Sequence, residues 1–466
     1  MLFNSYVFLF GFLPAVLVSC WAVRRKSLRL AVLTLASWFF YAWWDWRFLP
    51  LMLSTTSVDY VAALAIARSD DERRRRLLLV ASLTVNLSLL GYFKYAGFFL
   101  GSLNGIGRAL GLPVGLPTLH ILLPIGISFY TFNSMSYTID VFRRRTEPTK
   151  HVLEYTAFVA LFPHLVAGPI VRFTDLAEQL RRPRRALSAH AASIGLFFLA
   201  CGLVKKLLIA DQLSPHVDRL FAHPGQLGLV SSWAAALGYS LQLYFDFSGY
   251  SDMAVGLAWL IGFRFPQNFN SPFKAQNISD FWRRWHMSLS AWFRDYLFIP
   301  LGGSRRGPLR TTANLIVTMF LAGLWHGAAW TFVVWGLVHG ALLGTHALLR
   351  RGGLTPGSVA LNRALTFAAV VAAFVVFRAS SLGAAGRMLA AMAGFRGVEQ
   401  IGQLQQLLPL RFVALLLALV VFVQAAPNTW ELRLRPRVSY GIATGIAAAL
   451  AIMTIANPHP FIYFQF

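Results

Sequence analysis

Long apolar runs, separated by short basic segments, occupy most of the chain. Several approach the roughly 20 residues that a helix needs to cross a bilayer, and the pattern predicts about ten to twelve crossings. The runs lie at residues 5–23, 29–45, 48–68, 77–98, 190–210, 228–262, 312–349, 362–378, 409–425 and 438–456. The longer ones have room for two spans, or for one span and a re-entrant piece. We therefore predict an all-α, polytopic membrane protein.

The apolar runs of the middle of the chain are interrupted by polar residues, Gly and Pro, whereas those at both ends are not. This change predicts three parts within a single membrane domain. Residues 1–118 are expected to form plain peripheral helices, and residues 351–466 return to Ala-, Leu- and Val-rich helices. Between them, residues 119–350 carry Gly, Pro, Ser, Asn, Asp and Arg inside the apolar runs. Irregular backbone at membrane depth persists only where protein or a watery cavity surrounds it. The middle part is therefore the predicted functional core.

One predicted helix of this core, residues 278–297, is amphipathic at about 100° per residue. Its apolar arc holds Phe281, Trp282, Trp285, Leu289, Trp292, Phe293 and Tyr296, and its polar arc holds Asp280, Arg283, Arg284, Arg294 and Asp295. His286 lies at the border, where a side chain can reach both an apolar substrate and water. A structural role for this histidine is the alternative. The residues expected to line a cavity or bind substrate are Trp282, Arg283, Arg284, Trp285 and Ser288.

Composition agrees with a membrane protein, because 57% of the 466 residues are hydrophobic and only 13% are charged. The net charge of +24 does not indicate a nucleic-acid partner, since Lys and Arg cluster beside apolar runs, at 24–26, 73–76, 143–145 and 181–185. Such clusters mark the cytoplasmic side and contact anionic lipid headgroups. Two apolar runs separate the first two clusters. We therefore expect the N-terminus on the outer side of the membrane.

A histidine lies inside one of the apolar runs: His326, in Leu-Ala-Gly-Leu-Trp-His-Gly-Ala-Ala-Trp (Leu321 to Trp330). A titratable side chain is costly at bilayer depth and usually serves a function there. An imidazole titrates near neutral pH and can take the proton of an attacking hydroxyl. Trp325 and Trp330 would exclude water around it. The alternative is a histidine that bonds a neighbouring helix and stabilises packing.

Three other histidines are expected to be structural. If residues 312–349 form one unbroken helix, His339 and His346 point about 140–160° away from His326 and serve packing or the interface. His164 lies between two prolines and is expected in a structural loop, with a place in the cavity as the alternative.

Two carboxylates, Asp246 and Asp252, lie among aromatic residues with Ser248 and a glycine between them. We expect a broken helix here, in which Asp and Ser side chains cap the freed backbone. Pairing of Asp246 or Asp252 with Arg283 or Arg284 would neutralise the buried charges. A metal site is not expected, because no second His/Asp/Glu cluster has ligand spacing. The chain also lacks Gly-x-Ser-x-Gly, P-loop and His-Glu-x-x-His motifs.

Together these motifs resemble the membrane-bound O-acyltransferase (MBOAT) family, in the bacterial branch of alginate O-acetylation. The D-alanyl transfer proteins of teichoic acid modification form a related branch. The matching stretches are Leu123–Phe132, Leu165–Arg172, Phe245–Ala254, Asn268–Phe273, Asp280–Ser290, Gly323–Gly327 and Phe461–Phe466. One departure is Asn133, where the family leads us to expect Gln after Thr-Phe.

The resemblance implies a ring of transmembrane helices around a thinned centre with a through-membrane funnel. It implies that His326 is the catalytic base and His286 the second catalytic histidine. His286, Asn133 or backbone N–H groups would then hydrogen-bond the thioester carbonyl or the leaving sulfur. Asp246 and Ser248 are expected to line the cavity.

The implied reaction moves an acetyl group from a cytoplasmic thioester, acetyl-CoA, to an exported polysaccharide, without a bound cofactor. In a second route a periplasmic SGNH-type acetyltransferase partner receives the group. The implied setting is the bacterial inner membrane, with membrane lipid and polysaccharide export machinery as partners. Two alternatives stay open: D-alanyl transfer from a carrier protein to teichoic acid, and a non-enzymatic acyl or polymer transporter.

Overall fold

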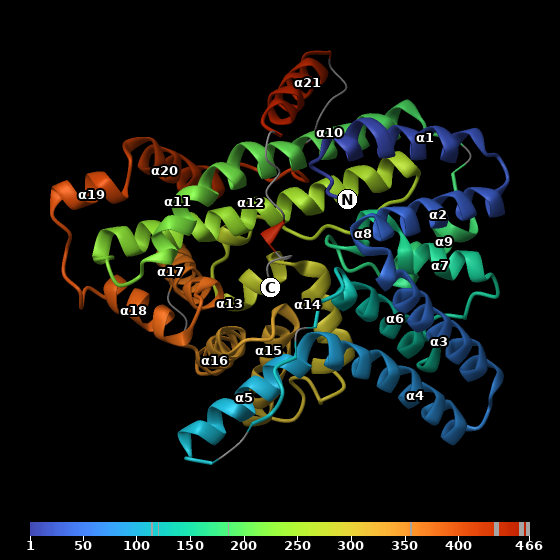
Figure 1. Ribbon diagram of the computed structural model, residues 1–466, viewed down its shortest axis with the longest axis horizontal. Coiled ribbons are helices and arrows are strands. Elements are labelled where there is room, and N and C mark those ends of the chain that lie inside the picture. The colour runs from blue at the N-terminus through green and yellow to red at the C-terminus, as the bar shows by residue number, and fades with distance from the viewer. Residues whose placement is uncertain are drawn as a thin grey trace. The chain divides into compact units, whose positions relative to one another are not determined.

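The computed structural model shows helices and connecting loops, with no β-strand in the described part of the chain (Figure 1). This part comprises residues 1–112, 115–119, 121–184, 186–354, 357–432, 438–455 and 461–462. The predicted all-α, polytopic class is confirmed. The chain divides into two compact units, Met1–Leu199 with Met253–Pro266, and Ala200–Asp252 with Gln267–Phe466. These limits differ from residues 118 and 350, where the composition of the apolar runs changes. The single-domain organisation stays a prediction.

The first unit contains the amino-terminal helices. In chain order they are η1 (Val7–Phe12), α1 (Leu13–Ala22), α2 (Lys26–Asp45), η2 (Trp46–Phe48), α3 (Leu49–Arg68), α4 (Glu72–Leu90), η3 (Gly91–Tyr95), α5 (Ala96–Ala109), α6 (Ile127–Phe142), α7 (Val152–Ala160), α8 (Phe162–Leu165), α9 (Phe173–Arg181) and most of α10 (Ala189–Leu203). Buried Asp59 of α3 accepts hydrogen bonds from Ser82 Oγ (2.5 Å) and Asn86 Nδ2 (2.8 Å) of α4. These polar contacts join two apolar helices.

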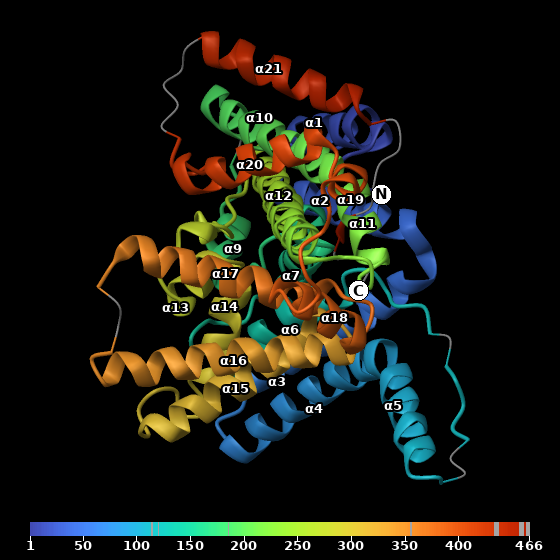
Figure 2. The same ribbon diagram turned by 90° about the vertical axis from the view of Figure 1, so that its left-hand side faces the viewer.

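The second unit contains the remaining helices. They are η4 (Val204–Ala210), α11 (Asp211–Ala222), α12 (Leu229–Ile261, whose last residues belong to the first unit), η5 (Pro272–Lys274), α13 (Ile278–Arg284), α14 (Met287–Phe293), η6 (Arg294–Phe298), α15 (Pro308–His326), α16 (Trp330–Arg351), α17 (Val359–Arg378), α18 (Leu382–Met392), α19 (Ile401–Leu407), α20 (Leu410–Ala425) and α21 (Val438–Met453). Helices α15 and α16 lie side by side (Figures 1 and 2).

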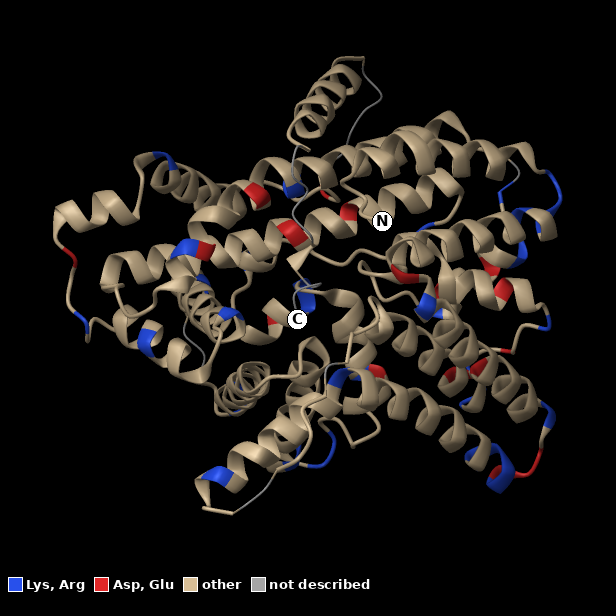
Figure 3. Cartoon of the chain, in the orientation of Figure 1, with Lys and Arg blue, Asp and Glu red and all other residues tan. Residues whose placement is uncertain are grey.

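Five helical stretches of the described chain are long and apolar enough to cross a membrane. They are Lys26–Arg68, Glu72–Ala109, Ala189–Ala222, Trp330–Arg351 and Val359–Arg378. The pair α19 and α20, bent by 77°, would add a sixth. This is fewer than the predicted crossings, partly because the runs at 29–45 and 48–68 join into one stretch of 43 residues. Lys and Arg lie mainly at helix ends and in loops (Figure 3), as the charge clusters indicated.

Helix α12 is continuous through residues 244–252, so the predicted break and capping there are wrong. Gly249 remains helical and has a packing role. A Cβ at this position would come within 2.9 Å of the Gly202 carbonyl oxygen of α10 and 3.0 Å of the Lys205 side chain. The glycine therefore permits the close approach of a neighbouring helix and does not make a turn.

The predicted pairing of the α12 carboxylates with Arg283 or Arg284 is also wrong. Asp246 pairs with Lys206 at 2.5 Å, and Asp252 pairs with Lys205 at 2.6 Å. Both lysines lie on η4, which follows the helix that packs on Gly249. The close helix contact thus brings consecutive lysines to the two carboxylates, and each buried charge has an opposite charge beside it.

Residues 312–349 form a helical hairpin, not one unbroken helix. Helix α15 ends at His326 and α16 begins at Trp330. A Cβ at Gly340 would come within 2.7 Å of Ile316 Cα, and one at Gly344 within 2.6 Å of Thr312. The contacts move toward the start of α15 (from Ile316 to Thr312) as they move toward the end of α16 (from Gly340 to Gly344), so the two helices run antiparallel. Their close contact depends on residues without side chains.

The predicted helix over 278–297 is broken at its centre. Helix α13 ends at Arg284, and α14 begins only after His286, whose φ of +42° is left-handed. The two arcs survive the break, since Trp285 and Leu289 are buried whereas Arg283 is exposed. The periodicity therefore predicted burial correctly but missed the change of direction.

Replacing Gly340 by Val should weaken the α15–α16 hairpin, because the new side chain meets backbone that cannot move aside. We expect the free energy of unfolding to fall by about 1–3 kcal/mol, measured by thermal unfolding in detergent micelles. Gly445→Val in α21 is the matched control, since no described atom lies within 4 Å of its Cβ position. Equal losses in the two variants would contradict the packing role.

Candidate active site

Three histidines and two tryptophans of the second unit form one buried group, the histidine cluster: His286, Trp325, His326, Trp335 and His339. The Trp325 ring contacts both His286 and His326, with centroid distances of 6.0 and 5.1 Å. The Trp335 ring contacts His326 and His339 at 5.1 and 4.8 Å. The structure therefore brings the two predicted catalytic histidines to the same tryptophan.

His326 is the last residue of α15, and Gly327 ends the helix. A Cβ at Gly327 would overlap the ring of Phe332 near the start of α16. This glycine lets the chain turn tightly, so the end of α15 stays against α16. The ring of His326 also packs on Phe377 of α17, with a centroid distance of 5.3 Å. Aromatic side chains of three helices thus hold this imidazole.

The loop before α13 fixes the backbone of His286. The Met287 N–H donates to the Asn268 carbonyl oxygen at 2.9 Å, and the Asn270 N–H donates to the Arg284 carbonyl oxygen at 2.9 Å. These bonds bracket His286, which has a left-handed φ that non-glycine residues adopt at a cost. The loop thereby turns the imidazole away from the helical direction and toward Trp325.

The side chain of Asn268 determines which nitrogen of His286 carries a proton. Its Oδ1 accepts from the Ser288 N–H (3.3 Å) and the Ser288 hydroxyl (2.9 Å), and it lies 3.2 Å from His286 Nδ1. Because a backbone N–H can only donate, the atom facing it is the amide oxygen. His286 Nδ1 must then be the donor. In a neutral ring, Nε2 is left with a lone pair.

The Nε2 atom of His286 is buried and has no hydrogen-bond partner among the described residues. Burial lowers the pKa of His286 to about 3, so the ring is neutral at neutral pH. It can therefore accept a hydrogen bond at Nε2 but cannot donate one from that atom. This differs from the role implied by the family resemblance, in which His286 donates to a carbonyl or a leaving sulfur.

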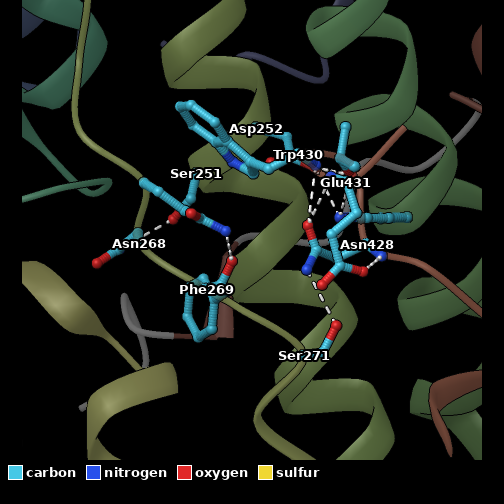
Figure 4. Close-up of polar contacts among 11 residues, drawn as sticks. Ser251, Asp252, Asn268, Phe269, Ser271, Asn428, Trp430 and Glu431 are labelled. Atoms are coloured by element: carbon cyan, nitrogen blue, oxygen red, sulfur yellow. Dashed lines mark hydrogen bonds and ion pairs between the residues drawn. The ribbon is translucent and has the colours of Figure 1, made fainter. Parts of the chain in front are cut away.

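A network of side chains anchors Asn268 in turn (Figure 4). Its Nδ2 donates to Ser251 Oγ of α12 at 3.1 Å. Further along the same loop, Ser271 Oγ accepts from Asn428 Nδ2 at 3.0 Å. The neighbouring Thr429 hydroxyl donates to Asp252 at 2.7 Å. The loop that positions His286 is thus tied to α12 and to the segment after α20.

His339 belongs to the cluster, which corrects the expectation that it points away from His326. That expectation assumed an unbroken helix, whereas the hairpin returns α16 along α15. Trp282 Nε1–H donates to His339 Nδ1 at 3.3 Å, which leaves the proton of a neutral ring on Nε2. Among the described residues, no group of three His, Cys, Asp or Glu side chains is placed to hold a metal ion.

Several predicted cavity residues have other contacts in the second unit. Trp285 packs between Phe269 and Phe374, with centroid distances of 5.1 and 5.2 Å. Arg284 pairs with Asp280 at 2.8 Å. These two predicted residues therefore support the local fold.

Four further predicted residues also lie outside the histidine cluster. Trp330 is 51% exposed at the start of α16, and its predicted role as a wall around His326 stays a prediction. Asp246, already paired with a lysine, accepts the Ile462 N–H at 3.0 Å. Ser248 is buried on α12, and its hydroxyl has no partner among the described residues. Asn133 lies in the first unit.

In the first unit, Asn133 Nδ2 lies 3.2 Å from His164 Nδ1, and both side chains are buried. Burial lowers the pKa of His164 to about 4, so this ring too is neutral at neutral pH. His164 therefore has a specific side-chain partner.

Sequence reasoning missed Asn268, Trp335 and His339 as members or supports of the site. Asn268 lies in the stretch Asn268–Phe273, which carried the family resemblance, but a loop residue has no periodicity that would reveal its direction. Trp335 and His339 depend on the turn between α15 and α16. The three glycines Gly336, Gly340 and Gly344, four residues apart, were the available signal for that hairpin.

Residues 26–377 match the sequence profile of the membrane-bound O-acyltransferase family. The chain is 46% identical to a protein of Azotobacter vinelandii named probable alginate O-acetylase AlgI, over 90% of this chain and 84% of the relative. It is 38% identical to the peptidoglycan O-acetyltransferase of Helicobacter pylori, over 86% and 81% of the two chains. A teichoic acid D-alanyltransferase of Bacillus subtilis is 27% identical over 55% of this chain and 67% of the relative.

Replacing Asn268 by Ala should remove the acceptor shared by His286 and Ser288. We expect a loss of about 1–3 kcal/mol in the free energy of unfolding, because buried donors are left unsatisfied. The signature specific to positioning is the His286 tautomer, measured by nitrogen-15 solid-state NMR: the Nδ1-protonated form should lose its dominance. Asn268→Asp is the matched control, since its carboxylate still accepts from Nδ1. An unchanged tautomer in Asn268→Ala would refute the assignment.

Proposed function

The chain belongs to the membrane-bound O-acyltransferase family, and we propose that it transfers an acetyl group from a cytoplasmic thioester to a hydroxyl on the outer side of the membrane. Acyltransferase activity is the property that its family and relatives share. The observation that supports a histidine mechanism is the contact of His286 and His326 with one buried tryptophan ring. Two imidazoles close to a common apolar wall suit proton transfer in a dry site.

In the proposed reaction, the acceptor hydroxyl lies against His326. The imidazole takes the hydroxyl proton as the oxygen attacks the thioester carbonyl carbon, and a C–O bond forms. The tetrahedral adduct then collapses and its C–S bond breaks. The imidazolium returns the proton to the departing sulfur, which leaves as a thiol. The products are the acetyl ester of the acceptor and the free thiol of the donor, and His326 returns to its neutral form.

His286 supports this reaction as a neutral hydrogen-bond acceptor. The single hydrogen of the attacking hydroxyl goes to His326, so the Nε2 lone pair of His286 would accept a hydrogen bond from another hydroxyl of the acceptor and hold it in place. The lowered pKa of His286 makes it a poor proton acceptor at neutral pH, which leaves proton removal to His326. The carbonyl oxygen would then depend on other donors in the site, such as backbone N–H groups.

We propose acetyl-CoA as the donor and an exported polysaccharide as the acceptor. The names of two relatives support the acetyl group and the polymer acceptor, since one is called a probable alginate O-acetylase and another a peptidoglycan O-acetyltransferase. In the second route, a periplasmic SGNH-type acetyltransferase receives the acetyl group and completes the transfer beside the export machinery. D-alanyl transfer is the second candidate, favoured by the similarity to the Bacillus subtilis protein.

The proposed location is the bacterial inner membrane, with the N-terminus on the periplasmic side. The basic segment at residues 24–26, directly after the first apolar run, supports this orientation, because positive loops are retained in the cytoplasm. A thioester donor from the cytoplasm and an acceptor from the periplasm could then reach the site from opposite sides.

Replacing His326 by Ala should lower the transfer rate by about 10²–10⁴-fold, the usual contribution of a positioned base. The measurement is radiolabelled acetyl transfer from acetyl-CoA in proteoliposomes that contain the acceptor or the partner. His190→Ala is the control, since His190 is an exposed histidine of the first unit. Near-normal transfer by His326→Ala would refute the role of this histidine.

The chemistry of the transferred group separates the two candidate activities. Mild base should release acetate from the modified polymer made by the wild-type protein, detected by chromatography. Mild base cleaves both an acetyl ester and a D-alanyl ester, so the acid that is released identifies the group that the protein transferred. Release of D-alanine in place of acetate would assign the second candidate.

A further inference from the structure

An open polar pocket of about 540 Å³ lies in the second unit, apart from the residues of the histidine cluster. Its polar wall includes Gln276 and Asn277 before α13 and Arg283 on α13. Helix α16 contributes His346 and Arg350. Asn362 of α17 also lines the pocket. Segments that are distant in the sequence therefore build it together.

The pocket has an excess of positive charge. Arg283 and Arg350 are exposed, and neither forms an ion pair with another described residue. The single lining carboxylate, Asp280, is already engaged: one oxygen pairs with Arg284 at 2.8 Å, and the other accepts the Gln276 N–H at 3.2 Å. The charges of both lining arginines also act on the His346 ring. The acid therefore does not neutralise the two guanidinium groups.

The pocket lies at the ends of two candidate membrane spans, where a span reaches the boundary between membrane and water. Arg350 is in the last turn of α16 and Asn362 is in the first turn of α17, and both helices qualify as spans. Residues at the ends of spans lie at the depth of lipid headgroups. Basic pockets between transmembrane helices at this depth are suited to phosphate groups.

We propose that this pocket binds a phosphate-bearing anion. Guanidinium groups form forked, charge-assisted hydrogen bonds with phosphate oxygens, and the side-chain amide of Gln276 can supply a neutral donor. The volume exceeds that of a bare phosphate, so the pocket also holds part of the group attached to it. Two sources share this chemistry: the headgroup of an anionic phospholipid and the phosphates of a soluble nucleotide-type thioester carrier.

The test uses the full-length protein in phosphatidylcholine nanodiscs and two probes. Coenzyme A is titrated by isothermal calorimetry, and phosphatidylglycerol is added in steps and counted as bound lipid by native mass spectrometry. The test variant is Arg283→Gln with Arg350→Gln. The matched control is Arg351→Gln, an exposed arginine that adjoins Arg350 but does not line the pocket.

We expect the wild type to bind at least one probe, and the double variant to lose about tenfold or more in affinity for it. The control should stay within about twofold of the wild type. Binding of coenzyme A assigns the soluble source, and binding of phosphatidylglycerol alone assigns the headgroup. The proposal is overturned if the wild type binds neither probe, or if Arg351→Gln loses as much affinity as the double variant.

Both readouts measure binding without acyl transfer, so their result does not depend on the proposed reaction. Circular dichroism and size-exclusion profiles of the three proteins check folding. The two substituted arginines are exposed, so the variants are expected to fold.

Discussion

Buried polar groups in this apolar chain must find their partners within the protein, because neither lipid nor a packed core replaces the hydrogen bonds of water. Asp246 and Asp252 show the constraint directly, since each has a lysine of η4 within 2.6 Å. The lysines reach them because Gly249 lets α10 approach α12 closely. Packing and charge therefore depend on each other, and losing the close contact would separate buried charges from their partners.

The same constraint gives the histidine cluster its chemical character. The amide oxygen of Asn268 accepts hydrogen bonds from His286 Nδ1 and from the backbone N–H and hydroxyl of Ser288, which places the proton of His286 on Nδ1. A tryptophan ring contacts each of these imidazoles, so each has an apolar neighbour. Electrostatic interactions are stronger in such low-dielectric surroundings. A proposed base and a neutral acceptor can thus occupy one site in different roles.

Helix α13 links the two sites of the second unit. Trp282 donates a hydrogen bond to His339 of the cluster, and the adjacent Arg283 lines the polar pocket proposed to bind an anion. The helix ends just before His286, whose strained backbone begins the next helix. One helix of seven residues therefore carries side chains of both the pocket and the histidine cluster.

The sequence alone determined the class of the protein and two of its central residues. Membrane helices follow from local composition, and the isolated His326 and the border position of His286 are visible along one segment. The tertiary structure decided their partners. His339 joins the cluster only because glycines let α16 turn back against α15, and Asn268 acts through a loop without periodic signal. The lysine partners of the α12 carboxylates lie 40 and 47 residues away along the chain, and only helix packing selects them. Local periodicity specifies which face is buried, whereas contacts between distant segments specify which atoms meet there.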